Sequence, residues 1–460
     1  MASRTAPASV SCKQQPRLTR ANLAALVALV AALTALLAAV VLPSSTRASR
    51  APRTAHYIAQ LAAMHSPAPP RTLRVGTLNV RYDFAARHPL SSLGDGERRW
   101  AERRDALVDM VTWEELDVVG FQEVLHSQFE DLQALLPDDE WGSVGVGRDD
   151  GRRAGEAVPI FYRRASLRLV PGSVSHRWLS PTPLKPGSRG WDAGQPRMVT
   201  FARFADARAS GGQGHAEVLV ANTHWDDRGV RAREESAMLI RTLVEEELSR
   251  GAEAEGTEPL VVLLGDLNSP DEEEGYQLLT GRRYPSFPKG GLGATEDGPA
   301  AAGRSFFDAR RELAVRGSAL AGPGAPSSRF GPLNTFTGFS AADIPKVIDF
   351  ILPFANNAFV PLSGASSGLV GAPGGNSTAW KVARYGVLPN FYSDLGGRVP
   401  AGTEGARDSL VRSDHRLVVA RFDEVVALRG EACGVEVGRE ELEPAAVVEG
   451  DTAPSARGHR

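Results

Sequence analysis

Polar side chains that could perform acid–base or metal chemistry lie at the ends of short apolar runs in this sequence. Carboxylate, amide and imidazole side chains end runs such as DVVGFQEV and LVVLLGDLNS, and a Ser-Asp-His triplet precedes RLVVARF. α/β proteins gather their functional residues at the carboxyl ends of strands, so we expect these side chains to meet at one edge of a sheet. The candidates are Asn79, Glu123, His224, Asp226, Asp266, Asn268, Asp349, Ser413, Asp414 and His415.

Cysteine chemistry is excluded from the body of the chain. Only Cys12 and Cys433 are present, one near each end of the 460 residues. A disulfide framework, a cysteine-ligated zinc site and a cysteine nucleophile in the body are therefore ruled out. Any catalysis must come from oxygen and nitrogen side chains.

Short apolar runs and helical patterns alternate along the chain. Several runs are apolar at every position, as strands covered on both faces are; they occupy 73–80, 117–121, 158–162, 198–204, 217–222, 260–264, 347–352 and 416–422. Apolar residues at helical spacing predict helices over 100–112, 127–136 and 231–248. This alternation predicts an α/β fold. Two stretches rich in Gly, Pro and Ser, 281–333 and 354–408, are interpreted as long surface excursions of one domain.

The strand-end residues, in this order, resemble those of the endonuclease/exonuclease/phosphatase superfamily of metal-dependent phosphoesterases. The resemblance covers about 71–425 and rests on Asn-Thr-His, Gly-Asp-Leu-Asn and Ser-Asp-His. The segments 147–162, 178–193 and 335–339 are similar to stand-alone hydrolases of that superfamily. The resemblance implies a DNase I-like four-layer α/β/β/α sandwich, in which helices cover two central sheets.

The resemblance also implies a divalent metal site. Glu123 is the expected main ligand of Mg²⁺, with Mn²⁺ as the alternative ion, and Asn79 and Asp414 would complete or adjoin the site. The chemistry agrees with these residue types, because in-line attack of water on phosphorus builds up charge that a hard cation neutralises. Such cations prefer carboxylate and amide oxygens.

The remaining candidates are assigned to the phosphate and the attacking water. Asp266 would orient or deprotonate the water, while Asn268 and His224 would donate hydrogen bonds to the phosphate. His415 would bind or protonate the reacting phosphate. Asp349 would hold the His415 ring in its tautomer, because a buried carboxylate beside an imidazole favours the cation.

Four further residues are candidates for the substrate cleft: Trp191, Asp192, Arg197 and Asp226. For Trp191 the alternative is a lid over the core, and for Asp226 it is a supporting role behind the site. The sequence departs from the family pattern at two places, with Asp227 where His is common and Leu417 where Pro is common. We expect these departures to affect substrate fit more than the chemistry.

Charge is segregated along the chain, whose net charge is −3. Residues 1–70 carry seven Lys or Arg and no acid, whereas 426–460 form an acidic tail with seven acids and four basic residues. The body is left mildly acidic. Proteins that grip long nucleic acids usually have a basic surplus, so charge alone does not favour a nucleic-acid partner.

An apolar run near the N-terminus predicts a membrane segment. Residues 21–42 contain no charge, Gly or Pro, and 22 helical residues span roughly 33 Å, enough to cross a bilayer. We interpret 1–20 as a basic segment, 21–42 as a transmembrane signal anchor and 43–70 as a linker. The body is expected on the lumenal or extracellular side, where Asn376 would be a glycosylation acceptor. The alternative is a cleaved signal peptide and a secreted protein.

The sequence as a whole predicts a membrane-anchored, divalent-metal-dependent phosphoesterase that hydrolyses a phosphodiester or phosphomonoester by in-line water attack. The phosphate-ester partner could be a lipid headgroup, a sugar phosphate or a nucleic acid, and the oligomeric state is left open. Two alternatives are a nuclease acting on DNA or RNA and an inactive membrane-tethered binding protein of the same fold. The complete set of candidate residues argues against the inactive protein.

Overall fold

A computed structural model describes most of the body of the chain. The described residues are 71–87, 97–208, 217–250, 258–282, 304–313, 329–339, 342–359, 361, 377–392 and 410–427. All described helices and strands belong to the compact unit Thr72–Arg460. The expected segments 1–20, 21–42 and 43–70, the tail after 427 and Asn376 lie outside the described residues. Within the described ranges, no helix has the length and apolar character needed to span a bilayer.

The first sheet has six strands in the order β11-β14-β1-β2-β4-β3. Its central pair, β1 and β2, is parallel, and every other neighbouring pair is antiparallel. The strands are β1 (Thr72–Asn79), β2 (Val118–Gln122), β3 (Trp141–Val144), β4 (Ile160–Arg163), β11 (Ser377–Val387) and β14 (Val418–Ala427).

The second sheet repeats this plan. Its order is β10-β9-β8-β7-β5, with β6 also paired to β7, and only β8 and β9 run parallel among these strands. The strands are β5 (Leu167–Leu169), β6 (Ser175–Trp178), β7 (Met198–Asp206), β8 (Glu217–His224), β9 (Leu260–Asp266) and β10 (Asp349–Pro353). A further two-stranded ladder joins β12 (Phe391–Tyr392) and β13 (Leu410–Val411).

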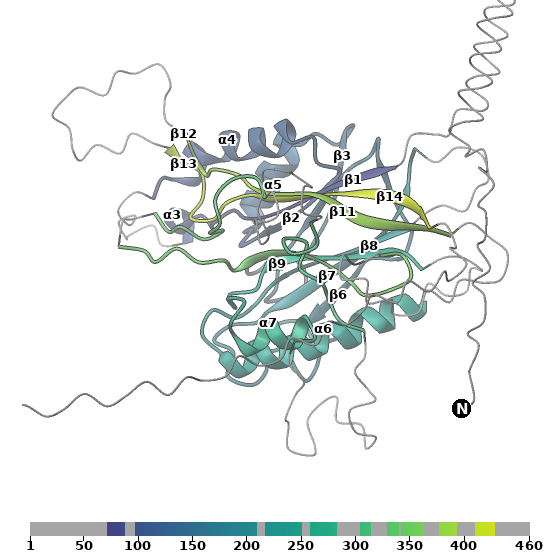
Figure 1. Ribbon diagram of the computed structural model, residues 1–460. Helices are drawn as coiled ribbons and strands as arrows, with labels where there is room; N and C mark the ends of the chain where they lie inside the picture. Colours follow the sequence, from purple (N-terminus) through teal and green to yellow (C-terminus); the bar gives the residue numbers. More distant parts are fainter. Residues whose placement is uncertain are drawn as a thin grey trace, which may run out of the picture. The chain divides into compact units, whose positions relative to one another are not determined.

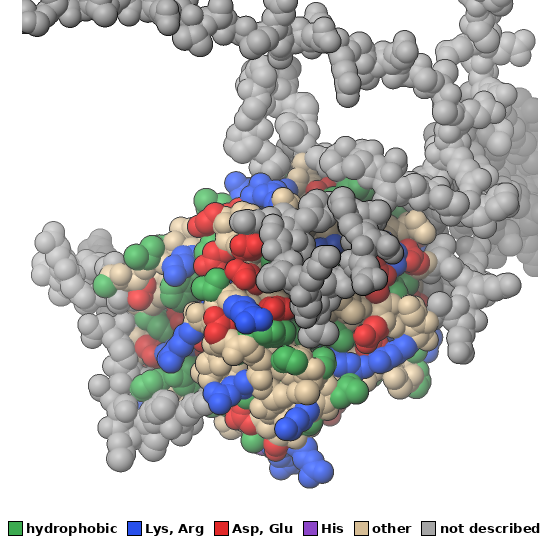
Figure 2. Space-filling model, turned by 90° about the horizontal axis from the view of Figure 1, so that it is seen from below, with side chains coloured by type: hydrophobic (Ala, Val, Ile, Leu, Met, Phe, Trp, Pro, Cys, Tyr) green, Lys and Arg blue, Asp and Glu red, His purple; other side chains and the backbone are tan. Residues whose placement is uncertain are grey.

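Helices cover the outer face of each sheet (Figure 1). On the first sheet lie α4 (Trp100–Trp113) and α5 (His126–Leu135), and on the second lie α6 (Val230–Arg250) and α7 (Glu274–Leu279). The short helix α3 (Phe84–Arg87) follows β1. Both α4 and α6 fall where helical spacing of apolar residues predicted them. Figure 2 shows acidic and basic side chains interspersed over the face on the α6 and α7 side.

Buried apolar residues form three main layers that match this arrangement. One cluster lies between the sheets and includes Val75 of β1 and Val262 of β9. A second joins the β8 and β9 side to α6, through residues such as Ile240. The third joins β1 and β2 to α4, through residues such as Leu107. Because each sheet is buried on both faces, its central strands are apolar at nearly every position.

The polar edge expected from the sequence is present, although two of its elements arrive from the opposite direction. Asn79, His224 and Asp266 close β1, β8 and β9, whereas Asp349 opens β10 and His415 precedes β14. Asp349 and His415 therefore depart from the general placement at the carboxyl ends of strands, and the position of His415 agrees with the Ser-Asp-His triplet that precedes RLVVARF. Since β10 and β14 are antiparallel to β9 and β1, their starts still lie at the same edge.

The interpretation of 354–408 as a surface excursion was wrong over part of its length. Residues 377–387 form β11, which pairs with β14. The register shifts between Val382 and Arg384, and such a bulge breaks the period-two alternation by which a strand is recognised. The short strands β3, β5 and β6 were also missed, because runs of three or four residues carry little pattern.

Candidate active site

The Asn79 side chain connects the two sheets at the polar edge. Its Nδ2 donates to Glu123 Oε1 at 2.9 Å and to Asp266 Oδ2 at 3.0 Å. The backbone N–H groups of Arg81 and Tyr82 donate to Asn79 Oδ1 and Glu123 Oε2 at 2.9 and 3.1 Å. One amide therefore fixes a carboxylate from each sheet.

Three residues of this edge have left-handed backbone. The φ angles are 58° at Arg81, 60° at Glu123 and 47° at Asn268. Non-glycine residues rarely adopt this conformation, which costs on the order of 1 kcal/mol or more, and it is concentrated at functional sites. Glu123 and Asn268 lie directly beyond β2 and β9, where this turn brings their side chains to the polar edge.

His415 lies between two carboxylates of the second sheet. Its Nδ1 is 2.9 Å from Asp349 Oδ2, and its Nε2 is 3.7 Å from Asp266 Oδ2. Although burial alone would lower its pKa, Asp349 and Asp266 raise the pKa of His415 to about 10. A pKa this high favours the imidazolium form of the ring at neutral pH.

The Thr-Phe-Thr-Gly-Phe segment supports the histidine pair. Thr335 Oγ1 accepts hydrogen bonds from the backbone N–H groups of Ile348 and Asp349, both at 3.0 Å. The rings of Phe336 and His415 meet edge to face with centroids 5.0 Å apart. These contacts fix the start of β10 and the plane of the imidazole.

His224 and Asn268 form a second polar contact beside Asp266. Asn268 Nδ2 is 3.1 Å from His224 Nε2 and donates to the Trp225 carbonyl oxygen at 3.1 Å. The backbone N–H of Asn268 donates to Asp266 Oδ1 at 2.9 Å. Asn268 Nδ2, which was expected to reach the phosphate, thus contacts His224 and Trp225 within the protein.

Two buried arginines stand behind His224. Arg148 forms a bidentate pair with Glu156, at 2.8 and 3.0 Å, and Arg197 contacts Asp227 at 2.8 Å. Burial, Arg197 and Arg148 hold the pKa of His224 well below its usual value. The role of Arg148 was missed, although it lies in the Gly-Arg-Asp-Asp-Gly motif that carried the resemblance.

Of the four residues expected in the substrate cleft, Asp192 and Asp226 have carboxylates that accept hydrogen bonds from backbone N–H groups. Asp192 accepts hydrogen bonds from Arg231 N and Ala232 N at 3.2 and 2.7 Å, so its carboxylate caps the first turn of α6. Asp226 accepts from the backbone of both Gly194 and Gly229, at 3.1 and 2.8 Å, and thereby ties the 191–197 loop to the end of β8. Both carboxylates therefore stabilise the conformation of the 191–197 loop.

Trp191 and Arg197 are the other two candidates for the cleft. Trp191 has partly exposed surface, and Arg197 has a side-chain nitrogen that could donate a hydrogen bond. Trp191 is half-buried, has a φ of 55°, and lines a cavity of about 530 Å³ with Lys185 and Arg189. Arg197 is buried, and its Nη1 has no hydrogen-bond partner among the described residues.

A buried amide pair below the site was not expected from the sequence. Gln122 Nε2 donates to Asn222 Oδ1 at 2.7 Å and to Thr77 Oγ1 at 3.0 Å, which joins β2 of one sheet to β8 of the other. Asn222 Nδ2 donates to two backbone carbonyls across the same gap. Asn222 was part of the Asn-Thr-His motif, but its contact with Gln122 could not be read from either strand alone.

The donor set fits a divalent cation. The positive groups that act on the four carboxylates of the edge are Arg81, Arg103 and His415, and the carboxylates are Glu123, Asp266, Asp349 and Asp414. Burial and Asp349 raise the pKa of Asp266 to about 7, and burial with Glu123 raises that of Asp414. Burial and a neighbouring carboxylate disfavour the ionised form of both acids, and a bound cation would favour it.

Two groups of residues could supply its ligands. Asp266, Asp349 and His415 have ligand atoms within 4.8 Å of one another. Glu123, Asn79 and Asp414 form the other group, at the ends of β1 and β2 and before β14. In the first group, His415 Nδ1 already pairs with Asp349.

Comparison with known proteins agrees with the fold and the residue types. The chain matches the Endonuclease/Exonuclease/phosphatase family over residues 76–415. No curated protein sequence gives a significant match.

Three solved structures that the chain resembles come from Bacteroides. An endonuclease/exonuclease/phosphatase family protein from Bacteroides thetaiotaomicron is 24% identical, with 77% of this chain and 95% of that chain covered and a TM-score of 0.53. Its homologue from Bacteroides vulgatus is 25% identical, with 76% and 98% coverage and a TM-score of 0.51. A mannosyl-6-phosphatase of Bacteroides thetaiotaomicron VPI-5482 is 25% identical, with 76% and 99% coverage and a TM-score of 0.52. The family match spans most of the chain, and the polar edge carries the carboxylate, amide and imidazole side chains that the resemblance implied. The protein therefore belongs to the endonuclease/exonuclease/phosphatase family of phosphoesterases.

Proposed function

We propose that this protein hydrolyses a phosphomonoester, on a sugar or a lipid headgroup, with a divalent cation and an in-line water. The observation that carries the proposal is the single polar edge at which Asn79 joins Glu123 to Asp266, with the His415–Asp349 pair beside Asp266. At this edge, carboxylate and amide side chains of the kind that bind metals lie within a few ångströms of side chains that can accept or donate a proton.

Glu123, with Asn79 and Asp414, is the group that we assign to the cation. Arg81 and the Asn79 amide lower the pKa of Glu123 despite the effect of burial, so this carboxylate stays ionised and able to bind a metal. Mg²⁺ is the proposed ion, and Mn²⁺ is the alternative. When bound, the ion would neutralise charge on the phosphate as it reacts.

The other residues act on the attacking water and on the phosphate oxygens. Asp266, whose pKa of about 7 suits proton transfer near neutral pH, accepts the proton of the attacking water. His415 donates to a phosphate oxygen through Nε2, because its Nδ1 is held by Asp349. Asn268 and His224 bind further phosphate oxygens once the contact between them opens.

Three features support a small phosphomonoester over a nucleic acid. The body is mildly acidic, and the described α6 and α7 face carries acids and bases together (Figure 2). The Bacteroides relative of known activity is a mannosyl-6-phosphatase. Nucleic-acid binding usually draws on a basic surface, so a nuclease is the second candidate and an inactive binding protein the third.

A substrate panel tests the proposal directly. The full-length protein with Mg²⁺ is assayed on p-nitrophenyl phosphate, bis-p-nitrophenyl phosphate, mannose 6-phosphate, a phosphorylated lipid headgroup, DNA and RNA. We expect release of phosphate from monoesters, and no release in EDTA. Preferred cleavage of DNA or RNA would establish the nuclease instead, and inactivity on every substrate with either Mg²⁺ or Mn²⁺ would favour the binding protein.

We further propose that residues 21–42 anchor the protein as a single-pass membrane protein, with the body lumenal or extracellular. The uncharged run of 22 residues between basic flanks supports this placement. The full-length protein should stay in the membrane pellet through carbonate washing. Recovery of a soluble form that starts after residue 42 would show a cleaved signal peptide and a secreted enzyme.

A further inference from the structure

Three arginines lie side by side across neighbouring strands of the first sheet. In the strand registers, Arg74 of β1 is opposite Arg421 of β14, and Arg421 is opposite Arg384 of β11. Like charges directly opposite one another destabilise a sheet. Such an arginine row therefore needs a compensating interaction.

Acidic neighbours compensate only part of the row. Arg74 pairs with Glu115 at 2.6 Å, and Arg421 pairs with Asp423 at 2.9 Å. Arg384 is exposed and has no hydrogen bond or ion pair with any residue that the structure describes. One guanidinium at the end of the row thus remains available.

The bulge in β11 is what directs Arg384 into this row. Val382 and Tyr385 both pack in the inner cluster between the sheets, although strict alternation would place residues three apart on opposite faces. The register shift between Val382 and Arg384 absorbs the extra residue and leaves Arg384 opposite Arg421. Bulges are commonly used to re-aim a functional side chain.

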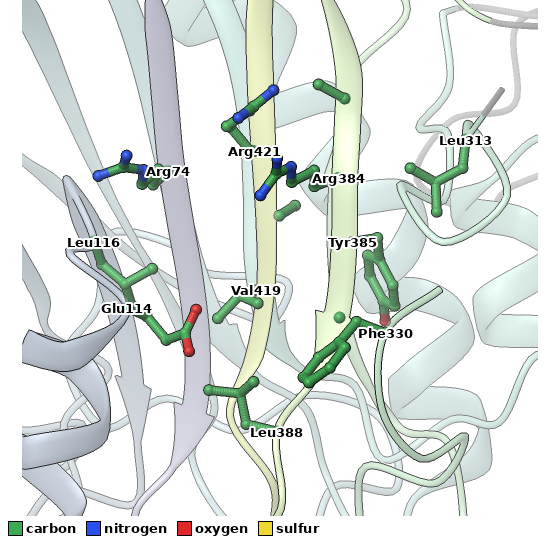
Figure 3. A pocket seen from close by; sticks show the side chains of 13 residues that line it. Arg74, Glu114, Leu116, Leu313, Phe330, Arg384, Tyr385, Leu388, Val419 and Arg421 are labelled. Atoms are coloured by element: carbon green, nitrogen blue, oxygen red, sulfur yellow. The ribbon is translucent and has the colours of Figure 1, made fainter. Parts of the chain in front are cut away.

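A pocket of about 590 Å³ lies along the arginine row (Figure 3). The three guanidinium groups occupy one end, and Glu114, Leu388 and Phe330 are grouped at the other. Phe330 is 66% exposed, although an aromatic ring of this size normally packs in the core. The volume is within the range of small-molecule sites.

We propose that this pocket binds a small, hydroxylated organic phosphate of sugar-phosphate size. Its phosphate lies on Arg384 and Arg421, because guanidinium forks match phosphate oxygens. Its hydroxyls donate to Glu114, and its apolar ring face packs on Phe330. The site is separate from the catalytic edge, since Arg74 is five residues before Asn79 on β1, roughly 17 Å at 3.3 Å per residue.

The test is calorimetric binding of glucose 6-phosphate to the full-length protein in EDTA. Arg384→Met should weaken binding at this pocket at least about tenfold, the usual effect of losing a charge-assisted hydrogen bond. Lys381→Met is the matched control, because Lys381 is an exposed cation of the same strand that does not line the pocket. Asn268→Ala separates this pocket from the catalytic edge and should retain the binding that Arg384→Met loses.

Melting temperatures complete the test. Without ligand, Arg384→Met should melt at or above the wild-type temperature, because the substitution relieves repulsion along the row. Equal weakening by Arg384→Met and Lys381→Met, loss of all binding in Asn268→Ala, or absence of binding at millimolar glucose 6-phosphate in wild type would each overturn the proposal. Arg421→Met serves as a second variant and should also weaken binding.

Discussion

The two sheets bring carboxylates to one edge but tune them in opposite directions. Glu123, after β2, has a lowered pKa because Arg81 and the Asn79 amide outweigh burial. Asp266, at the end of β9, has a pKa raised to about 7 by burial and Asp349. The same amide touches both carboxylates. Paired acids whose environments drive their pKa values apart typically have different roles in a site, and we propose metal binding for Glu123 and proton transfer for Asp266.

A similar contrast separates two histidines. His415, buried between Asp349 and Asp266, has a pKa raised to about 10. His176 of β6 is half-buried beside Arg177, and burial together with that arginine lowers its pKa to about 4. Burial disfavours the charged form in both rings, so the neighbouring charges decide the outcome.

The largest effect is expected for His415→Ala. If the imidazolium bears on the phosphate in the transition state, kcat/KM should fall on the order of 10²–10⁴, the usual contribution of a positioned acid or base. The measurement is kcat/KM on the best monoester of the panel, with the melting temperature recorded alongside. Near-wild-type rates in a well-folded variant would contradict the role of His415 as the acid.

Glu123→Gln should weaken the binding of the metal and leave proton transfer unchanged. The concentration of Mg²⁺ needed for half-maximal rate should rise by about 10–100-fold, as when a metal site loses part of its coordination. Glu97→Gln is the control, because Glu97 contacts the same Arg81 at 3.1 Å but is not at the polar edge. An unchanged metal requirement in Glu123→Gln would shift the assignment to Asp266, Asp349 and His415.

Asp349→Asn should reduce the rate less than His415→Ala, by about 10-fold, and should change the pH profile. The proposed mechanism requires protonated His415, whose pKa of about 10 depends chiefly on Asp349 among the groups that raise it. Without that carboxylate the pKa falls, so activity on the alkaline side should be lost at lower pH than in the wild type. A pH profile of kcat/KM that superimposes on the wild-type profile would contradict the pairing.

The last expected effect is on folding stability rather than on rate, and it concerns His176. The unfolded chain, with an ordinary pKa near 6.5, binds a proton that the folded ring refuses down to about pH 4. Stability is therefore lost as pH falls from 6.5 to 4, by on the order of 2 kcal/mol. His176→Gln should remove this part of the acid sensitivity in urea unfolding curves, and an identical pH dependence in both proteins would show that the ring is not protonated on unfolding.

Much of the core could be predicted because burial on both faces leaves a local signature. The runs 198–204 and 260–264 are apolar throughout, and they lie within β7 and β9. Helix α6 was recognised from the apolar stripe between Arg231 and Leu248. By contrast, β11 was missed because its bulge at Ala383 and the glycine at 386 interrupt the alternation, and its pairing with β14 is a long-range contact.

The sequence by itself determined the types of residue at the polar edge and the strands that carry them, because each side chain stands at one end of a local apolar run. Only the tertiary structure decided how those side chains act. His415 meets Asp349 across 66 positions of sequence, and Asn79 reaches Asp266 across 187. The pKa values of Glu123 and Asp266 diverge for the same reason, since burial and neighbouring charge exist only once the two sheets have packed together.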